Sequence, residues 1–264
     1  MRIVECVPNF SEGRDKKVID SIAEVISAVE GVELLDVDPG ASTNRTVVTF
    51  VGEPDQVVEA AFQAIARASA LIDMRQHHGA HPRMGATDVC PFIPVSNITM
   101  SECVELAKRL GQRVGKELAI PVYLYAEAAQ REDRTNLADV RQGEYEKLAE
   151  RMSDGFKPDF GPQQFNAAAG ATVIGARKFL IAYNVDLNTR SQKLANDIAL
   201  TIREAGRAKR DADGNIIKDA SGVSVKEPGI LPATKAVGWY VDEYQRAQIS
   251  INLVDYERTS MHQA

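Results

Sequence analysis

The chain has 264 residues, of which 44% are hydrophobic and 26% are charged, and its formal net charge is -6. This composition is typical of a soluble globular protein, and the length allows one large domain or two ordinary ones. The acidic balance argues against nucleic-acid binding, because neutralising a phosphate backbone requires a basic surface. We find neither an apolar run of about 18 residues nor a secretory signal pattern, so we expect a cytoplasmic protein without membrane association.

Cysteine usage points away from disulfides and structural zinc. Cys6, Cys90 and Cys103 are odd in number and widely spaced. This pattern is that of neither a disulfide framework nor a zinc ribbon. We expect the three side chains to act as small buried hydrophobic groups.

Helix and strand patterns alternate along the first part of the chain. Apolar residues at helical spacing, and β-branched runs separated by turn residues, predict the elements. They are a strand at 2–7, a helix at 15–28, strands at 32–38 and 45–52, a helix from Pro54 to about 72, a strand at 88–95, a helix at 100–118, a strand at 121–127 and a charged helical stretch to about 152. Thr99 and Glu102 form a capping-box pattern, whereas Pro91 and Pro94 indicate an edge position or an irregular course for their strand.

A segment without periodicity, 153–171, carries three glycines and two prolines and is a candidate inter-domain linker or binding loop. The pattern beyond it predicts a strand at 177–187, a helix capped by Thr189 with Gln192 and running to about 205, an exposed hairpin excursion at about 210–230, and strands at 234–243 and 247–256. The order predicts an α+β protein of two units, 1–165 and 166–264, with mainly antiparallel sheets. The second unit lacks a second helix to cover its sheet, so we expect a truncated C-terminus.

Three of the four histidines lie within five positions, in "QHHGAHPRMGA" (76–86). A helical zinc site is unfavourable, because Gly79 disfavours helix and Pro82 moves His81 out of the helical region. No second cluster completes a four-ligand set, so we expect no metal. Either a catalytic base or a solvated polar loop is compatible with the residues, and His81 is the leading candidate for a base because Pro82 fixes its backbone.

The turn "DVDPGASTNR" (36–45) gathers polar residues at the end of a predicted strand. Such clusters often satisfy only local amides. The functional alternative is that Asp38 orients an imidazole while Arg45 binds a substrate carboxylate. Glycines at 161, 170 and 175 match neither a dinucleotide fingerprint nor a P-loop, which excludes nucleotide binding on that signal.

Several long stretches, in the same order, resemble one family. They are "VECVPNFSEG" (4–13), "LLDVDPGASTNRTVVTFVG" (34–52), "HPRMGATDVCPFIPV" (81–95), "IPVYLY" (120–125), "PDFGP" (158–162), "GATVIGARKFL" (170–180) and "AVGWYVDE" (236–243). They are similar to the formiminotransferase domain of glutamate formimidoyltransferases, which in animals forms the front half of a bifunctional enzyme with a cyclodeaminase. The resemblance runs from Met1 to about Tyr256.

The resemblance implies a fold and a reaction. The fold would be two ferredoxin-like α/β subdomains, with mainly antiparallel sheets facing each other and helices outside, in a homodimer. The reaction would transfer a formimidoyl group from N-formimidoyl-L-glutamate to tetrahydrofolate, giving 5-formimidoyltetrahydrofolate and L-glutamate in histidine degradation. Tetrahydrofolate would be a co-substrate, and no metal would be needed.

The resemblance also implies the site residues. The family's catalytic histidine falls on His81, within "HPRMG", and an aspartate with a supporting catalytic role falls on Asp38. Arg45, Arg83 and Arg177 are candidates for binding the glutamate carboxylates and the folate tail. The family's folate-contacting segment matches Gly161, Pro162, Gln163, Gln164, Phe165, Asn166, Ala167, Ala168, Ala169 and Gly170.

Two other functions stay open on the sequence. One is a folate-dependent formyltransferase that acts on N-formylglutamate. The other is a folate-binding protein without turnover, which the short C-terminus makes plausible.

Overall fold

The computed structural model describes residues 1–264, which form two compact units, Met1–Arg177 and Lys178–Ala264. Six α-helices and three sheets confirm the α+β class. The division follows Arg177 rather than residue 165, because the strand at 172–176 joins the sheet of the first unit. The segment 153–171 therefore lies inside the first unit and does not link the two units.

The first unit alternates strands and helices largely as the sequence predicts, but the strands at 9–10 and 172–176 were not predicted. The charged stretch before 152 is divided into three short pieces. Its elements are β1 (Ile3–Cys6), β2 (Asn9–Phe10), α1 (Lys16–Ser27), β3 (Val32–Gly40), β4 (Arg45–Gly52), α2 (Pro54–Leu71), β5 (Thr87–Ser96), α3 (Met100–Glu117), β6 (Val122–Ala126), the 3-10 turn η1 (Glu132–Arg134), α4 (Leu137–Val140), α5 (Glu144–Ser153) and β7 (Thr172–Ala176).

One mixed sheet of seven strands forms the centre of this unit. The short strands β1 and β2 follow each other and both pair with β4 and β5, so the order across the sheet is β3, β4, β1 with β2, β5, β7 and β6. β7 pairs in parallel with β5 and with β6, and the other pairings are antiparallel. The expectation of mainly antiparallel pairing is thus confirmed.

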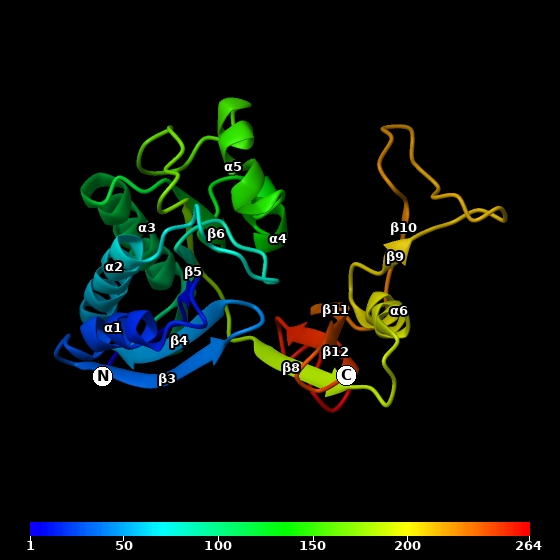
Figure 1. Ribbon diagram of the computed structural model, residues 1–264, viewed down its shortest axis with the longest axis horizontal. Coiled ribbons are helices and arrows are strands. Elements are labelled where there is room, and N and C mark those ends of the chain that lie inside the picture. Colours follow the sequence, from blue (N-terminus) through cyan, green and yellow to red (C-terminus); the bar gives the residue numbers. More distant parts are fainter. The chain divides into compact units, whose positions relative to one another are not determined.

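Side chains that alternate along the strands build a hydrophobic core on each face of the sheet. Cys90 and Phe92 of β5 belong to one core with residues of α1, α2 and α3, whereas Val89 belongs to a second core with residues of α4 and α5. This is the period-two pattern of a strand covered on both sides. Figure 1 shows α1, α2 and α3 together, apart from α4 and α5. Cys6, Cys90 and Cys103 are free thiols and fully buried, as expected.

The two prolines of β5 do not put that strand at an edge, so this part of the prediction is wrong. β5 lies inside the sheet, between β1 with β2 on one side and β7 on the other. The alternative, an irregular course, is confirmed, because the register shifts between Ile3 and Val4 and again between Asn9 and Phe10. Such irregularities let an inner strand contain residues that have no N–H to donate.

The second unit is smaller. Its elements are β8 (Ile181–Asp186), α6 (Gln192–Ile202), β9 (Arg207–Ala208), β10 (Lys226–Glu227), β11 (Thr234–Val241) and β12 (Arg246–Leu253). β11, β12 and β8 form an antiparallel sheet in that order. Gly238 of β11 allows α6 to pack closely on this sheet, since a Cβ at that position would collide with the backbone of Ala195 and Asn196. The residues between β9 and β10 form the predicted exposed excursion, which Figure 1 shows as an extended arm.

The helix caps were predicted with mixed success. Thr99 caps α3 in a complete capping box with Glu102, as expected. Thr189 does not cap α6; Ser191 does, by accepting a hydrogen bond from the amide of Leu194 at 3.3 Å. The Thr189 hydroxyl instead accepts from the amide of Ser191, in a local turn before the helix.

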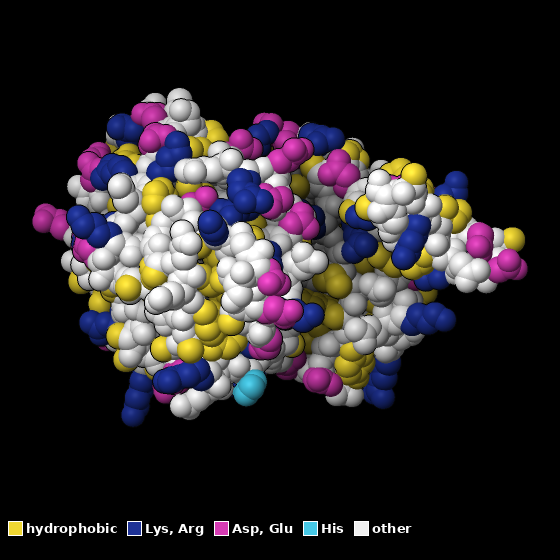
Figure 2. Space-filling model, turned by 90° about the horizontal axis from the view of Figure 1, so that it is seen from above, with side chains coloured by type: hydrophobic (Ala, Val, Ile, Leu, Met, Phe, Trp, Pro, Cys, Tyr) yellow, Lys and Arg dark blue, Asp and Glu magenta, His cyan; other side chains and the backbone are white.

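The molecular surface carries charges of both signs. Figure 2 shows Lys and Arg side chains interspersed with Asp and Glu over the face drawn there. None of the helices combines the length and the apolar character needed to pass through a membrane.

The capping box of α3 gives a stability prediction. We expect Thr99→Ala to lower the free energy of unfolding by about 1 kcal/mol, because the first turn of α3 loses its side-chain acceptor. In a chain of this size such a loss lowers the thermal unfolding midpoint by about 2–4 °C. Ser101→Ala, at an exposed position in the same turn, is the matched control, and equal midpoints for the two variants would contradict the prediction.

Candidate active site

His81 lies in the loop between α2 and β5 and is half-buried. Its Nδ1 atom is buried and has no hydrogen-bond partner in the protein. Burial lowers the pKa of His81 to about 3, and the positive charges of Arg45 and Arg141 act in the same direction. The imidazole is therefore neutral at pH 7 and able to accept a proton.

Arg45, at the start of β4, supplies one of these charges. Its Nη1 donates to Oδ1 of Asn9 at 2.6 Å, while its Nε is buried without a partner. Burial lowers the pKa of Arg45 and Arg141 lowers it further, whereas Asp88 and Asp38 oppose the shift. Two buried polar atoms without partners, on His81 and Arg45, indicate a site that a polar ligand would complete.

Arg141 and Asp88 form a buried ion pair beside this site. Asp88, at the start of β5, is only 1% exposed, and its carboxylate accepts from the amide of Met84 at 3.0 Å and from Nε of Arg141 at 3.2 Å. Nη2 of Arg141 donates to the second carboxylate oxygen. Sequence reasoning missed Arg141, because no local pattern links it to a residue 53 positions earlier.

Asp38 lies exposed on β3, at the register position opposite Val47. No hydrogen bond joins it to His81. Its charge acts on Arg45, whose pKa it raises. Any supporting role of Asp38 would thus pass through Arg45.

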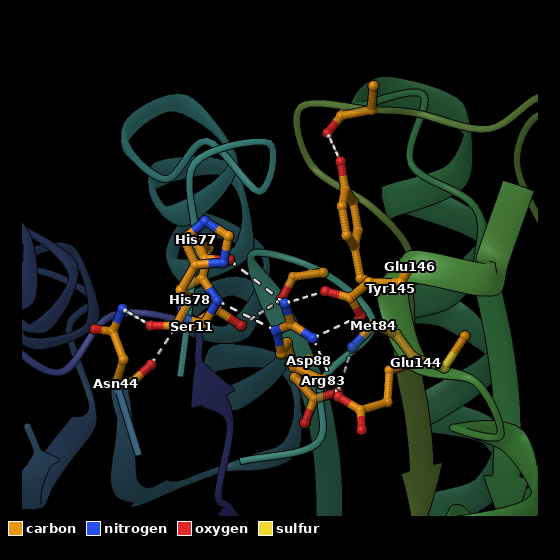
Figure 3. A network of polar contacts seen from close by, with 12 residues as sticks. Ser11, Asn44, His77, His78, Arg83, Met84, Asp88, Glu144, Tyr145 and Glu146 are labelled. Atoms are coloured by element: carbon orange, nitrogen blue, oxygen red, sulfur yellow. Dashed lines mark hydrogen bonds and ion pairs between the residues drawn. The ribbon is translucent and has the colours of Figure 1, made fainter. Parts of the chain in front are cut away.

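Arg83 is nearly buried and forms ion pairs with two glutamates of the protein. Its side chain is 8% exposed, and its guanidinium donates to Glu146 from both terminal nitrogens, at 2.8 and 2.6 Å, and to Glu144 at 3.1 Å, as Figure 3 shows. This geometry does not support Arg83 as a ligand of substrate carboxylates, because two protein carboxylates already occupy that side of the guanidinium.

The histidine loop, residues 72–86 between α2 and β5, is not a solvated polar loop throughout. His77 is buried and hydrogen-bonded through both ring nitrogens, whereas His78 is exposed. The three histidines therefore have three different environments. The structure also shows no group of three or more His, Cys, Asp or Glu side chains arranged to hold a metal ion.

The end of the segment 161–170 lies directly against the histidine loop. The amide of Ala86 donates to the carbonyl of Ala169 at 2.9 Å, and the amide of Met74 donates to the carbonyl of Ala168 at 2.8 Å. Gly85 and Gly170 form an isolated bridge, and a Cβ on either glycine would collide with the facing backbone. The structure thus brings the second part of the expected folate segment next to the loop that carries His81.

The beginning of the same segment lies elsewhere in the unit. Gly161 has a left-handed backbone, with φ of 83°, and packs against Gly115 of α3 and the carbonyl of Ile120. Arg177 follows β7, where its amide donates to the carbonyl of Phe92 at 3.0 Å and its charge lowers the pKa of Tyr125, which burial raises.

Two family profiles together match nearly the whole chain. The profile described as "Formiminotransferase domain, N-terminal subdomain" matches residues 3–177, and that described as "Formiminotransferase domain" matches residues 182–264. Their limits agree with the two compact units of the structure.

Individual relatives are similar over the full chain. A protein named "Glutamate formimidoyltransferase" from Thermoplasma acidophilum is 45% identical over 100% of this chain and 80% of its own length, and one of the same name from Streptococcus pyogenes serotype M1 is 42% identical over 99% and 80%. "Formimidoyltransferase-cyclodeaminase" from Rattus norvegicus is 52% identical over 99% of this chain and 45% of its own length, so this chain spans about half of that longer relative. With both profiles matched in order and identities of this size, the chain belongs to the formiminotransferase family.

Proposed function

We propose that the chain transfers the formimidoyl group from N-formimidoyl-L-glutamate to tetrahydrofolate, giving 5-formimidoyltetrahydrofolate and L-glutamate, a step of histidine degradation. The observation that carries the proposal is the buried Nδ1 of His81, which has no protein partner and lies where the charges of Arg45 and Arg141 act on the ring. Relatives named as glutamate formimidoyltransferases, 42 and 45% identical, support the choice of reaction.

In this proposal His81 moves one proton. The neutral imidazole takes the proton from the attacking folate nitrogen and returns it to the departing nitrogen of glutamate. The same proton serves both halves of the reaction, so the site needs only one acid/base group. The buried Nδ1 without a partner fits a group that meets its partner only when substrate is present.

The neighbouring cations would bind the anionic substrate and adjust the base. A glutamate carboxylate at Arg45 would satisfy the unpaired Nε and offset the guanidinium charge. Because that charge lowers the pKa of His81, its neutralisation would raise the pKa toward the range suited to proton exchange. Arg141 would act on the substrate and on the pKa of His81 in the same way, while its ion pair with Asp88 holds its side chain in place.

The remaining assignments follow the family resemblance. We assign folate binding to the segment 161–170, of which residues 168 and 169 bond to the histidine loop. Arg177 stays a candidate for the folate tail, and Asp38 a supporting residue. We also propose a homodimer of ferredoxin-like subdomains, for which the run β1, α1, β3, β4, α2, β5 with strand order β3, β4, β1, β5 is supporting evidence in the first unit.

Release of glutamate from N-formimidoylglutamate in the presence of tetrahydrofolate tests the proposed function. Turnover with this donor, and slower turnover with N-formylglutamate, is the expected result. Faster turnover with the formyl donor would favour the formyltransferase alternative. Binding of tetrahydrofolate by calorimetry without release of glutamate would favour the binding protein.

Replacing His81 gives the sharpest mutational prediction. His81→Ala should lower kcat by roughly two to four orders of magnitude, since it removes the acid/base group, while the Kd for tetrahydrofolate changes little. His78→Ala, an exposed histidine of the same loop, is the matched control. Near-normal kcat in the His81 variant would contradict the assignment.

The low pKa of His81 also predicts how stability depends on pH. The imidazole has a pKa of about 6.5 in an unfolded chain and about 3 in the folded protein, so between these values the unfolded state binds more protons. The stability that this group contributes is fully present above pH 6.5 or so and is lost as the pH falls toward the folded value. We expect the wild type to lose more stability than His81→Gln between about pH 7 and pH 5 in urea unfolding. Equal losses would show that the ring is not held neutral.

A further inference from the structure

We propose that residues 141–146, which lead from α4 into α5, act as a bracket that positions the histidine loop for proton transfer by His81. The bracket contains Arg141, Glu144, Tyr145 and Glu146, none of which is assigned a role in the reaction above apart from Arg141. The inference rests on the proposed function, because it concerns the placement of the proposed base.

The first contact of the bracket is with Arg83, two residues after His81. Glu146 accepts from both terminal nitrogens of Arg83, and Glu144 adds a third carboxylate contact. A bidentate pair fixes the orientation of the guanidinium as well as its charge. Because Arg83 is nearly buried, it has no alternative partner in water, so its position depends on these carboxylates.

Arg83 passes this restraint to the other side of the loop. Its Nε donates to Nδ1 of His77 at 3.2 Å, and Nε2 of His77 lies 2.9 Å from the carbonyl of Asn44. Since a carbonyl only accepts, His77 carries its proton on Nε2, which leaves Nδ1 as the acceptor that Arg83 needs. Burial lowers the pKa of His77, which keeps it in this neutral form. A continuous chain of contacts thus runs from Asn44 in the β3–β4 turn to Glu146 in α5 (Figure 3).

Two further contacts hold the neighbouring chain segments to the same bracket. The amide of Tyr145 donates to the carbonyl of Arg83 at 2.9 Å, and the Tyr145 hydroxyl donates to the carbonyl of Ala167 at 2.6 Å. Arg141 binds Asp88, where the histidine loop enters β5. The bracket therefore contacts the histidine loop at Arg83, the start of β5 at Asp88 and the expected folate segment at Ala167.

The backbone of the bracket has an unusual conformation that serves these contacts. Gly143 and Glu144 are both left-handed, with φ of 76° and 55°. A left-handed glutamate is sterically unfavourable, and such residues persist where surrounding contacts determine the conformation. Here the reversal begins α5 at Glu144, so that Glu144, Tyr145 and Glu146 all reach the histidine loop or the segment beside it.

Substitution of Glu146 can distinguish an effect on the position of His81 from an effect on folding. Its side chain is 58% exposed, so Glu146→Gln removes a charge without creating a cavity. Glu150→Gln, one turn later on α5 at another exposed position, is the matched control. We expect Glu146→Gln to lower kcat by about tenfold or more, because small displacements of a catalytic group are costly. The thermal unfolding midpoint should stay close to that of the control, because Glu144 still neutralises the charge of Arg83.

A double-mutant cycle with His81→Ala tests whether Glu146 acts through His81. If it does, Glu146→Gln lowers kcat in the wild type but causes no further loss in the His81→Ala background. The same fold-loss in both backgrounds, or a kcat equal to that of the Glu150 control, would overturn the proposal. Absence of turnover in the wild-type chain would instead refute the proposed function.

A second measurement does not depend on turnover. The chain has four histidines, so the imidazole signals can be assigned by NMR with single His variants. We expect one set of His81 signals in the wild type and in Glu150→Gln, and additional or broadened His81 signals in Glu146→Gln. An unchanged His81 spectrum in Glu146→Gln would overturn the proposal even if the enzyme were inactive.

Discussion

Two buried charges after His81 determine how the proposed active site is built. Arg83 and Asp88 are both nearly inaccessible to water, and each is neutralised by side chains from residues 141–146. A charge left without any partner at either position would be strongly unfavourable, so the conformation of the loop is coupled to that of the start of α5. The sheet supplies a rigid base, since Asp88 is the second residue of an inner strand.

In this arrangement, polar atoms of the proposed base and of the proposed carboxylate ligand have no hydrogen-bond partner. The charged residues that hold the loop have their partners, whereas Nδ1 of His81 and Nε of Arg45 are buried and have none. Such unpaired atoms are unfavourable in the free protein, and they favour a ligand that brings the missing acceptor or donor. Buried polar atoms without a protein partner, on a loop that other contacts hold in place, are consistent with the proposed binding of an anionic substrate.

The parts predicted from sequence are those that short-range rules control. The capping box at Thr99, the hairpin of β3 and β4 and the exposed arm depend on neighbouring residues, and all three are present. His81 was selected over His77 and His78 by Pro82 and by family resemblance. Arg141 and the carboxylates on Arg83 were missed, because contacts across 53 to 63 positions leave no local pattern. The boundary between the two units lies at Arg177 rather than at the predicted residue 165 for a similar reason. The parallel pairing of β7 with β5 cannot be predicted from the residues of β7 alone.

The place of β7 in the sheet also bears on the order in which the protein forms during synthesis. β7 is inserted between β5 and β6, although both precede it in the chain. β5 and β6 can each pair with β7 only after residues 172–176 have left the ribosome. Pairings between strands that are distant in the sequence also form slowly. The contacts of Ala168 and Ala169 with the histidine loop come from the residues just before β7. The proposed active site would therefore be among the last parts of the first unit to form, when most of that unit is already synthesised.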